Sequence, residues 1–194
     1  MNIPFLNYIK QYTFLTLGDI KLVWGVAKLK RVKAGEQIIR IGDLNYHGVV
    51  PLKGLLRNYY ITSEGEERTM FIVSKGMATG SGECILFGKP SDLTVEAIEP
   101  SLVLLVNSKK ILELAERHPR MLALQNKRFR MNIAEAAEQV RFYTVLSPEE
   151  RYIEYRDKNP KLIKRVPQKH LASYLGMTPV SLSRIKKRVA EKGI

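Results

Sequence analysis

The chain has 194 residues, 45% of them hydrophobic, and a formal net charge of +13. This length accommodates one large domain or two modest ones, and the composition suffices for a hydrophobic core. The single cysteine, Cys84, excludes a disulfide framework and any zinc or iron–sulfur site built from four cysteines, which fits a reducing cytoplasm. The N-terminus lacks the pattern of an export signal, and apolar runs such as 102–106 are too short to span a membrane. We therefore expect a cytoplasmic protein with no membrane partner.

The positive charge is concentrated at the C-terminal end. Residues 151–194 hold twelve Lys and Arg residues against three Asp and Glu residues, a formal charge of +9. Residues 1–150 hold twenty against sixteen, a formal charge of +4. The uneven distribution favours a polyanionic partner for the C-terminal segment. A basic surface that serves only solubility fits the charge equally well, so the charge alone does not decide between the two.

Residues 1–108 contain two kinds of pattern. Up to residue 29, apolar side chains at loose helical spacing predict short helices; they are Phe5, Leu6, Ile9, Ile20, Val23 and Trp24. From about residue 30, short β-branched and aromatic runs alternate with glycines. The predicted strands are Gln37–Ile41, Gly48–Pro51, Leu55–Ile61, Arg68–Val73, Thr94–Ile98 and Leu102–Val106, with a hairpin turn at 63–66. Turn residues at intervals of about ten predict an antiparallel sandwich or barrel.

The pattern after residue 107 is helical. Residues 109–117 predict a short amphipathic helix, which His118-Pro119 ends. No Pro or Gly occurs from Arg120 to Leu146, so one helix of about 40 Å is expected there. Its seam, spaced alternately by four and three residues, consists of Leu122, Asn126, Phe129, Ile133, Ala136, Val140 and Tyr143.

A seam with a period of about 3.5 residues is what two helices need to pack along their length, and a polar residue such as Asn126 within it fixes their register. We therefore interpret this helix as the interface of a homodimer. The alternative is a helix that packs on its own domain and needs no partner. Ser147-Pro148 follows as the predicted start of the next helix, with Ser147 as its N-cap.

The stretch 166–189 predicts a helix-turn-helix. Leu171, Ala172 and Leu175 share one face of the first helix, and Gly176 suits the tight turn that ends it. Thr178 is the predicted N-cap of the second helix, and Pro179 occupies its first position. The buried stripe of the second helix is predicted to be Leu182, Ile185 and Val189.

The opposite face of the second helix suits a DNA major groove, because it combines small side chains with arginines. The residues expected to read bases are Val180, Ser181 and Arg184. Arg184 is suited to a bidentate pair with guanine, and Val180 to a thymine methyl. The residues expected at DNA phosphates are Gln168, Lys169, Lys186, Lys187 and Arg188. A helical hairpin with a purely structural role is the alternative.

The run Leu175-Gly-Met-Thr-Pro-Val-Ser-Leu-Ser-Arg-Ile185, with Lys33-Ala-Gly-Glu36, Gly42-Asp43 and the Gly65 hairpin, resembles the Crp/Fnr family of bacterial transcription regulators. The resemblance implies an α+β fold: an N-terminal antiparallel β-roll (a double-stranded β-helix or jelly roll) of the cyclic-nucleotide-binding kind, a long dimerisation helix and a C-terminal winged helix-turn-helix. The corresponding domains are 1–118, 119–146 and 147–194. The resemblance also places Ser181 and Arg184 at bases, and Gln168 and Lys169 at the DNA backbone.

The match weakens at the effector pocket that the resemblance implies. Members that bind cyclic AMP have Gly-Glu, and ten residues after that Glu an Arg followed by Ser or Thr, the Arg neutralising the phosphate. This chain has Gly82-Glu83, but Leu93-Thr94 stand where that pair belongs. We interpret Gly82-Glu83 mainly as a turn, and we expect the protein to bind no cyclic AMP, no haem and no iron–sulfur cluster. Residues considered for another effector are Gly82, Glu83, Lys89, Ser91 and Thr94, with Lys89 as the candidate for an anionic ligand.

Together these patterns predict a homodimeric, sequence-specific transcription regulator that binds double-stranded DNA, with RNA polymerase as a further partner. An enzyme is disfavoured, because the three histidines, His47, His118 and His170, are far apart in the sequence and form no metal-binding pair. The competing class is a ligand-sensing or scaffold β-roll protein whose basic C-terminal segment binds acidic partners non-specifically.

Overall fold

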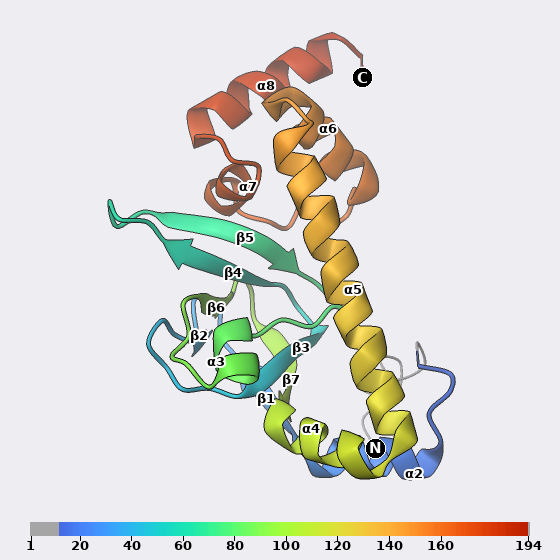
Figure 1. Ribbon diagram of the computed structural model, residues 1–194. Helices are drawn as coiled ribbons and strands as arrows, with labels where there is room; N and C mark the ends of the chain where they lie inside the picture. The colour runs from blue at the N-terminus through green and yellow to red at the C-terminus, as the bar shows by residue number, and fades with distance from the viewer. Residues whose placement is uncertain (1–11, 194) are drawn as a thin grey trace. The chain divides into compact units, whose positions relative to one another are not determined.

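The computed structural model describes residues 12–193 (Figure 1). They divide into two compact units. The first, which we call the roll unit, contains residues 12–60 and 71–130, and the second, the helical unit, contains 61–70 and 131–193. The predicted helices around Phe5, Leu6 and Ile9 lie outside the described residues. The three-part division at 118 and 146 stays a prediction.

The roll unit contains two antiparallel sheets. The strands are β1 (Ala27–Val32), β2 (Gln37–Ile39), β3 (His47–Lys53), β4 (Leu56–Ile61), β5 (Glu67–Val73), β6 (Thr94–Ala97) and β7 (Ser101–Asn107). One sheet has the order β1-β7-β3 and the other β2-β6-β4-β5. All six predicted strands are confirmed to within two residues at each end. The sheets form an open sandwich, not a closed barrel.

Strand β1 was not predicted. Its sequence alternates lysines with apolar residues, and it forms a sheet edge by pairing antiparallel with β7, from Ala27 opposite Val106 to Val32 opposite Ser101. Lysine is common on edge strands, where its side chain reaches water. The apolar signal that identified the other six strands is therefore weak in this one.

Strands β3 and β7 have apolar side chains on both faces. Val49 and Val103 join the core between the two sheets, whereas Val50, Leu52 and Leu104 pack with helical residues in a second core. Successive side chains of a strand point to opposite faces, so a sheet covered on both sides needs a continuous apolar run. The sequence of β3 meets this requirement at residues 49–52.

Three helical segments of the roll unit cover the outer face of the first sheet. They are α2 (Leu17–Gly25), α4 (Ser108–Arg117) and the start of α5 (Pro119–Thr144). Thr16 and Asp19 form a capping box at the start of α2. Ile20 and Val23 of α2, Ala115 of α4 and Met121 of α5 form the helical side of the second core. The expected helices over 109–117 and from Arg120 are confirmed.

The interpretation of Gly82-Glu83 as a turn is wrong. Both residues lie in α3 (Gly82–Phe87), a short helix capped by Ser81, whose hydroxyl accepts a hydrogen bond from the Cys84 N–H. Cys84 is fully buried and anchors this helix to the roll unit. A serine cap and one buried side chain therefore make a helix where the sequence indicated a turn.

The helical unit contains the C-terminal part of α5 together with α6 (Pro148–Lys158), α7 (Gln168–Tyr174) and α8 (Pro179–Glu191). Ser147 and Glu150 form a capping box at the start of α6, with Pro148 in its first position, as predicted. Leu171, Ala172, Leu175 and Leu182 have no exposed surface, and Ile185 and Val189 are buried beside them. The predicted core of the helix-turn-helix is confirmed.

The wing that the family resemblance implied is not found among residues 147–193, which contain helices and turns and no strand. Residues 159–167 form a linker of turns between α6 and α7, in which Leu162 and Arg165 donate backbone hydrogen bonds to residues three positions earlier. Pro160 and Pro167 lie near its two ends. Because proline has no N–H to donate to a strand partner, this sequence favours turns over a hairpin.

Gly176 lies at the turn between α7 and α8, with φ at +69°. We expect Gly176→Ala to lower the free energy of unfolding by roughly 1–2 kcal/mol, because the left-handed region is unfavourable for any residue with a Cβ. The added Cβ would also lie 2.7 Å from the Arg151 guanidinium, which must move. Chemical denaturation measures the change, with Gly82→Ala as a control because its Cβ meets no atom within 4 Å. Equal stability of the two variants would contradict the conclusion that the turn at Gly176 requires a glycine.

Candidate nucleic-acid interface

The exposed face of α8 is fixed by the residues at its start and along its back. Thr178 Oγ1 accepts a hydrogen bond of 3.1 Å from the Ser181 N–H, which starts the helix at Pro179. Leu182, Ile185 and Val189 face the core of the helical unit. The three residues predicted to read bases therefore lie on the outside: Val180 is 62% exposed, and Ser181 and Arg184 are exposed with it.

Arg184 is available for binding. Within residues 12–193 it has no salt bridge and no hydrogen bond. An exposed arginine with no partner on a helix whose other side is buried presents its five N–H donors to solvent. The geometry is therefore compatible with a contact to base edges, and the assignment of Val180, Ser181 and Arg184 to bases stays a prediction.

The cations further along α8 differ in their surroundings. Lys187 is exposed and lies 3.9 Å from Glu191. Arg188 forms a salt bridge with Glu149, in the first turn of α6, and Lys192 binds the same carboxylate at 2.9 Å. The hydrogen bond from Lys192, together with that from Arg188, lowers the pKa of Glu149. The Arg188 guanidinium is thus held against α6, whereas Lys187 is the freer candidate for a DNA phosphate.

Gln168, at the start of α7, connects the two helices of the helix-turn-helix. Its side-chain N–H₂ donates to the Pro179 carbonyl at 3.1 Å and to Ser183 Oγ at 2.6 Å. The amide therefore helps to position the first turn of α8, a role that the sequence did not indicate. Gln168 and its neighbour Lys169 are both exposed, as a phosphate contact requires.

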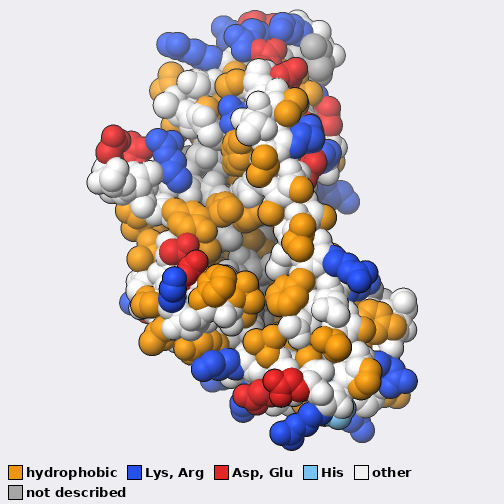
Figure 2. Space-filling model, in the orientation of Figure 1, with side chains coloured by type: hydrophobic (Ala, Val, Ile, Leu, Met, Phe, Trp, Pro, Cys, Tyr) orange, Lys and Arg blue, Asp and Glu red, His pale blue; other side chains and the backbone are white. Residues whose placement is uncertain are grey.

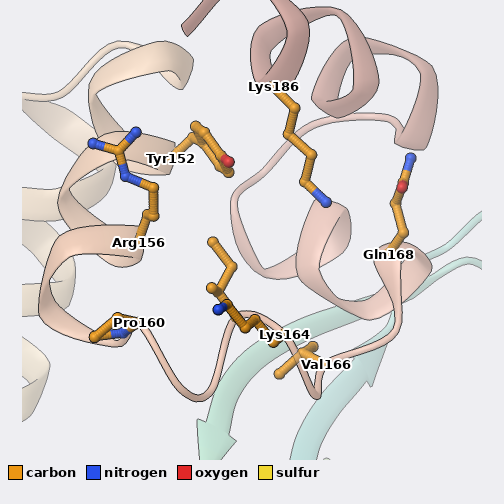
Figure 3. A pocket seen from close by; sticks show the side chains of 8 residues that line it. Tyr152, Arg156, Pro160, Lys164, Val166, Gln168 and Lys186 are labelled. Carbon is orange, nitrogen blue, oxygen red and sulfur yellow. The ribbon is translucent and has the colours of Figure 1, made fainter. Parts of the chain in front are cut away.

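A hollow with a volume of about 630 Å³ opens beside α8 in the helical unit (Figure 3). Its lining residues come from α6, the linker, α7 and α8. They are Tyr152, Arg156, Pro160, Ile163, Lys164, Val166, Gln168 and Lys186. Three of the side chains are cationic and none is acidic, so we call this feature the basic hollow. Lys186, predicted at a phosphate, is half-buried and extends from α8 into it.

The tip of the hairpin formed by β4 and β5 belongs to the helical unit and is bound to α7. Ser173 Oγ accepts a hydrogen bond of 2.9 Å from the Thr69 N–H and donates one of 3.1 Å to the Glu67 carbonyl. The Gln139 side chain of α5 donates to the Met70 carbonyl. One serine hydroxyl thus satisfies two backbone groups of the hairpin, a contact that no sequence pattern indicated.

The predicted dimer seam lies along α5, where hydrophobic side chains are exposed to solvent (Figure 2). Leu122 is 46% exposed, Ile133 69% and Val140 63%, and Asn126 and Ala136 are exposed between them. Phe129 and Tyr143 are half-buried. A row of exposed apolar side chains on a long helix is unfavourable in water unless another surface covers it. The seam is therefore available for a second copy of the chain.

Tyr143 is engaged within its own unit. Its ring contacts Phe142 edge-on at 5.3 Å, and its hydroxyl donates a hydrogen bond to the Tyr174 carbonyl. Burial raises the pKa of this hydroxyl. The C-terminal end of the seam is thus partly used to attach α5 to α7.

Comparison with known proteins agrees with this architecture. Residues 29–118 match the family of cyclic nucleotide-binding domains. FixK2 from Bradyrhizobium japonicum is 17% identical, with 87% of each chain covered and a TM-score of 0.76. A putative regulator of the Crp/Fnr family from Eubacterium rectale is 16% identical, with a TM-score of 0.74 over 96% of this chain and 89% of the other. The regulator CLP of Xanthomonas campestris, described as responsive to c-di-GMP, is 14% identical, with a TM-score of 0.67 over 92% of this chain and 93% of the other. A comparison with curated protein sequences finds no match.

The chain has the Crp/Fnr fold. The resemblance inferred from the sequence is therefore confirmed for the fold. Within the described residues, no helix is both long and apolar enough to cross a membrane, and no group of three or more His, Cys, Asp or Glu residues is placed to hold a metal ion.

The five residues considered for an effector pocket of this Crp/Fnr fold lie around α3 and the strand after it. Glu83 and Lys89 face each other at 3.8 Å, and Gly82 is the first residue of α3. Ser91 is buried, and its hydroxyl donates to the Leu93 carbonyl at 2.7 Å. Thr94 is buried, and its hydroxyl accepts a hydrogen bond from the backbone of Ile41. These hydroxyls already have backbone partners, and an effector role for the five residues stays a prediction.

A buried cation in the roll unit was missed by the sequence analysis. Arg57 of β4 is 2% exposed, binds Glu96 of β6 at 2.7 Å and lies over the Tyr59 ring at 4.1 Å. The sequence did contain a signal for this ion pair. Each of two predicted strands contains one charged residue, and a charge that is buried requires a partner of opposite charge. Glu96 neutralises this guanidinium.

We expect no binding of cyclic AMP at micromolar concentrations. Leu93, at the position where cyclic AMP-binding relatives have arginine, is 5% exposed and belongs to the core between the two sheets. A cyclic phosphate buried there would lack its cation, which is strongly unfavourable. Isothermal titration calorimetry of the purified protein with cyclic AMP provides the measurement. A dissociation constant in the micromolar range would show this expectation to be wrong.

Proposed function

We propose that this protein is a sequence-specific DNA-binding transcription regulator of the Crp/Fnr type, acting as a homodimer in the cytoplasm and not as an enzyme. The observation that carries the proposal is the outer face of α8, where Val180, Ser181 and Arg184 are exposed and Arg184 has no partner within residues 12–193. The buried back of the helix gives that face a fixed orientation in the helical unit. A helix with these properties suits the major groove.

The exposed seam of α5 supports a two-fold dimer in this proposal. Two copies of α8 related by a two-fold axis would bind a pseudo-palindromic operator with half-sites about 34–36 Å apart, one turn of the duplex. Lys187 and Lys169 would contact phosphates and increase affinity at every sequence, whereas Ser181 and Arg184 would discriminate between sequences. RNA polymerase is the further partner that such a regulator would contact at a promoter.

We propose that the effector of the roll unit differs from cyclic AMP. The position of Leu93 disfavours a cyclic mononucleotide phosphate, and one protein with the same fold is described as responsive to c-di-GMP. We therefore propose that the roll unit retains its architecture while its ligand chemistry has changed. Isothermal titration calorimetry with a set of cyclic dinucleotides, carried out as for cyclic AMP, tests this proposal.

Selection of binding sites from a pool of random DNA duplexes tests the proposed function. The purified protein is expected to enrich an inverted repeat with centres about 10–10.5 base pairs apart. Arg184→Ala, taken through the same selection, is expected to enrich no common sequence. Salt-sensitive binding by the wild type without any enriched sequence would contradict the proposal and favour the scaffold protein that binds polyanions non-specifically.

A further inference from the structure

We propose that the basic hollow binds the DNA backbone immediately outside the half-site that α8 reads. This inference rests on the proposed function and extends it to a second contact surface. The ligand is a phosphate of the duplex that flanks the operator. Arg156 of α6, Lys164 of the linker and Lys186 of α8 supply the positive charge.

The charges of the basic hollow favour an anionic occupant. Its three cations come from three separate segments, and no Asp or Glu lines it. Arg156 keeps an ion pair of 2.7 Å with Asp157, but Lys164 and Lys186 have no carboxylate partner within residues 12–193. Like charges brought together repel, and a bound anion removes that repulsion.

The direction in which Lys186 leaves α8 places this contact outside the base-reading face. An α-helix turns about 100° per residue, so Lys186 lies roughly 200° around the helix from Arg184. Its side chain extends from α8 into the hollow, as Figure 3 shows. A phosphate bound there would therefore belong to a part of the backbone other than the base pairs that Arg184 contacts.

The hollow is continuous with the candidate DNA-binding face through Gln168. This residue lines the hollow and also binds Pro179 and Ser183 at the start of α8. A DNA strand that passes the N-terminus of α7 beside Gln168 and Lys169 would continue over the hollow. The continuity, together with the formal charge of +9 on residues 151–194, favours nucleic acid over an acidic protein segment as the occupant.

Salt-dependent binding to two duplexes tests the proposal. Both contain the selected operator, and one ends at the outer edges of the half-sites while the other continues for about one helical turn on each side. The wild type is expected to bind the long duplex more tightly. The double variant Lys164→Ala/Lys186→Ala is expected to lose this advantage and to bind the short duplex like the wild type. Lys164→Glu, which leaves α8 unchanged, is expected to have the same effect.

The size of the effect follows from counterion release. Each phosphate contact contributes about 0.9 to the slope of log K against log salt, so one contact in each half of a dimer contributes about 1.8. On the long duplex the wild type should lose about tenfold more affinity than the double variant between about 50 and 200 mM salt. Lys161→Ala is the matched control, because Lys161 is an exposed cation of the same linker that does not line the hollow. Its affinities are expected to stay close to those of the wild type.

Three results would overturn the proposal. One is equal binding of both duplexes by the wild type, and another is a double variant that keeps the preference for the long duplex. The third concerns competition between poly-L-glutamate and the duplex. If the double variant abolished this competition without a change in duplex binding, the hollow would be assigned to an acidic protein segment. Absence of specific binding to either duplex by the wild type would instead remove the proposed function, and this inference with it.

Discussion

Replacing Arg184 by alanine is expected to remove most of the discrimination between the operator and random DNA. A bidentate arginine–guanine pair contributes about 1–3 kcal/mol of discrimination, so the two half-sites of a dimer lose about 2–6 kcal/mol. The side chain is exposed and has no partner within residues 12–193, so its loss should leave the folded protein unchanged. Fluorescence anisotropy with operator and scrambled duplexes measures the ratio of the two dissociation constants.

Lys187→Ala is the matched comparison, because it removes a positive charge from the same helix three residues later. Lys187 is exposed and should meet a phosphate, so its loss should weaken binding to the operator and to the scrambled duplex by the same factor. The ratio of the two dissociation constants should therefore stay at the wild-type value. If both variants changed that ratio equally, the division between base-reading and phosphate-contacting residues would be refuted.

The double variant Ile133→Glu/Val140→Glu is expected to convert the proposed dimer into a monomer at micromolar concentration. Both side chains are more than 60% exposed in the single chain, at 69% and 63%, so a dimer would bury four apolar side chains and the variant would instead place four carboxylates together. Burying an Ile or Val side chain contributes about 1.5–3 kcal/mol, and charge repulsion adds to its loss. Analytical ultracentrifugation measures the state of association.

Ala134→Glu is the control for this experiment. It adds a carboxylate at an exposed position of the same helix that lies outside the seam. We expect it to remain dimeric, and both proteins should keep a stability within about 0.5 kcal/mol of the wild type, since the changed residues are exposed in the single chain. A wild type that is monomeric at micromolar concentration would exclude the seam, as would a double variant that stays dimeric.

Much of the helical unit was predictable from the sequence because its signals are local. Thr178-Pro179 and Ser147-Pro148 mark helix starts through cap hydrogen bonds that span only three residues. Gly176 marks the turn because few residues other than glycine tolerate its positive φ. Leu182, Ile185 and Val189 recur at the helical period, which identifies the buried face of α8 and, by difference, the exposed one.

The features that sequence reasoning missed depend on contacts between distant segments. The basic hollow combines side chains from four segments, and only its cationic character was visible in the sequence. Ser173 binds the hairpin tip through residues more than one hundred positions away, which no periodicity indicates. Strand β1 and helix α3 were missed because their local signals are weak. Pairing with β7 stabilises the strand, and burial of Cys84 stabilises the helix.

The wing is a different case, because the expectation came from the family resemblance and not from the residues. Residues 159–167 contain two prolines and form turns. The basic hollow lies beside this linker, which contributes Pro160, Ile163, Lys164 and Val166 to its lining.

We propose that the outer face of α8 reads base edges through Arg184. The most direct test is a double-mutant cycle that combines Arg184→Ala with replacement of the contacted guanine by 7-deazaguanine, which lacks the N7 acceptor of the major groove. We expect a coupling energy of about 0.5–3 kcal/mol between the two changes, because each removes one half of the same contact. Strictly additive losses at every guanine of the half-site would show that Arg184 contacts none of them through N7 and would contradict base reading by this side chain.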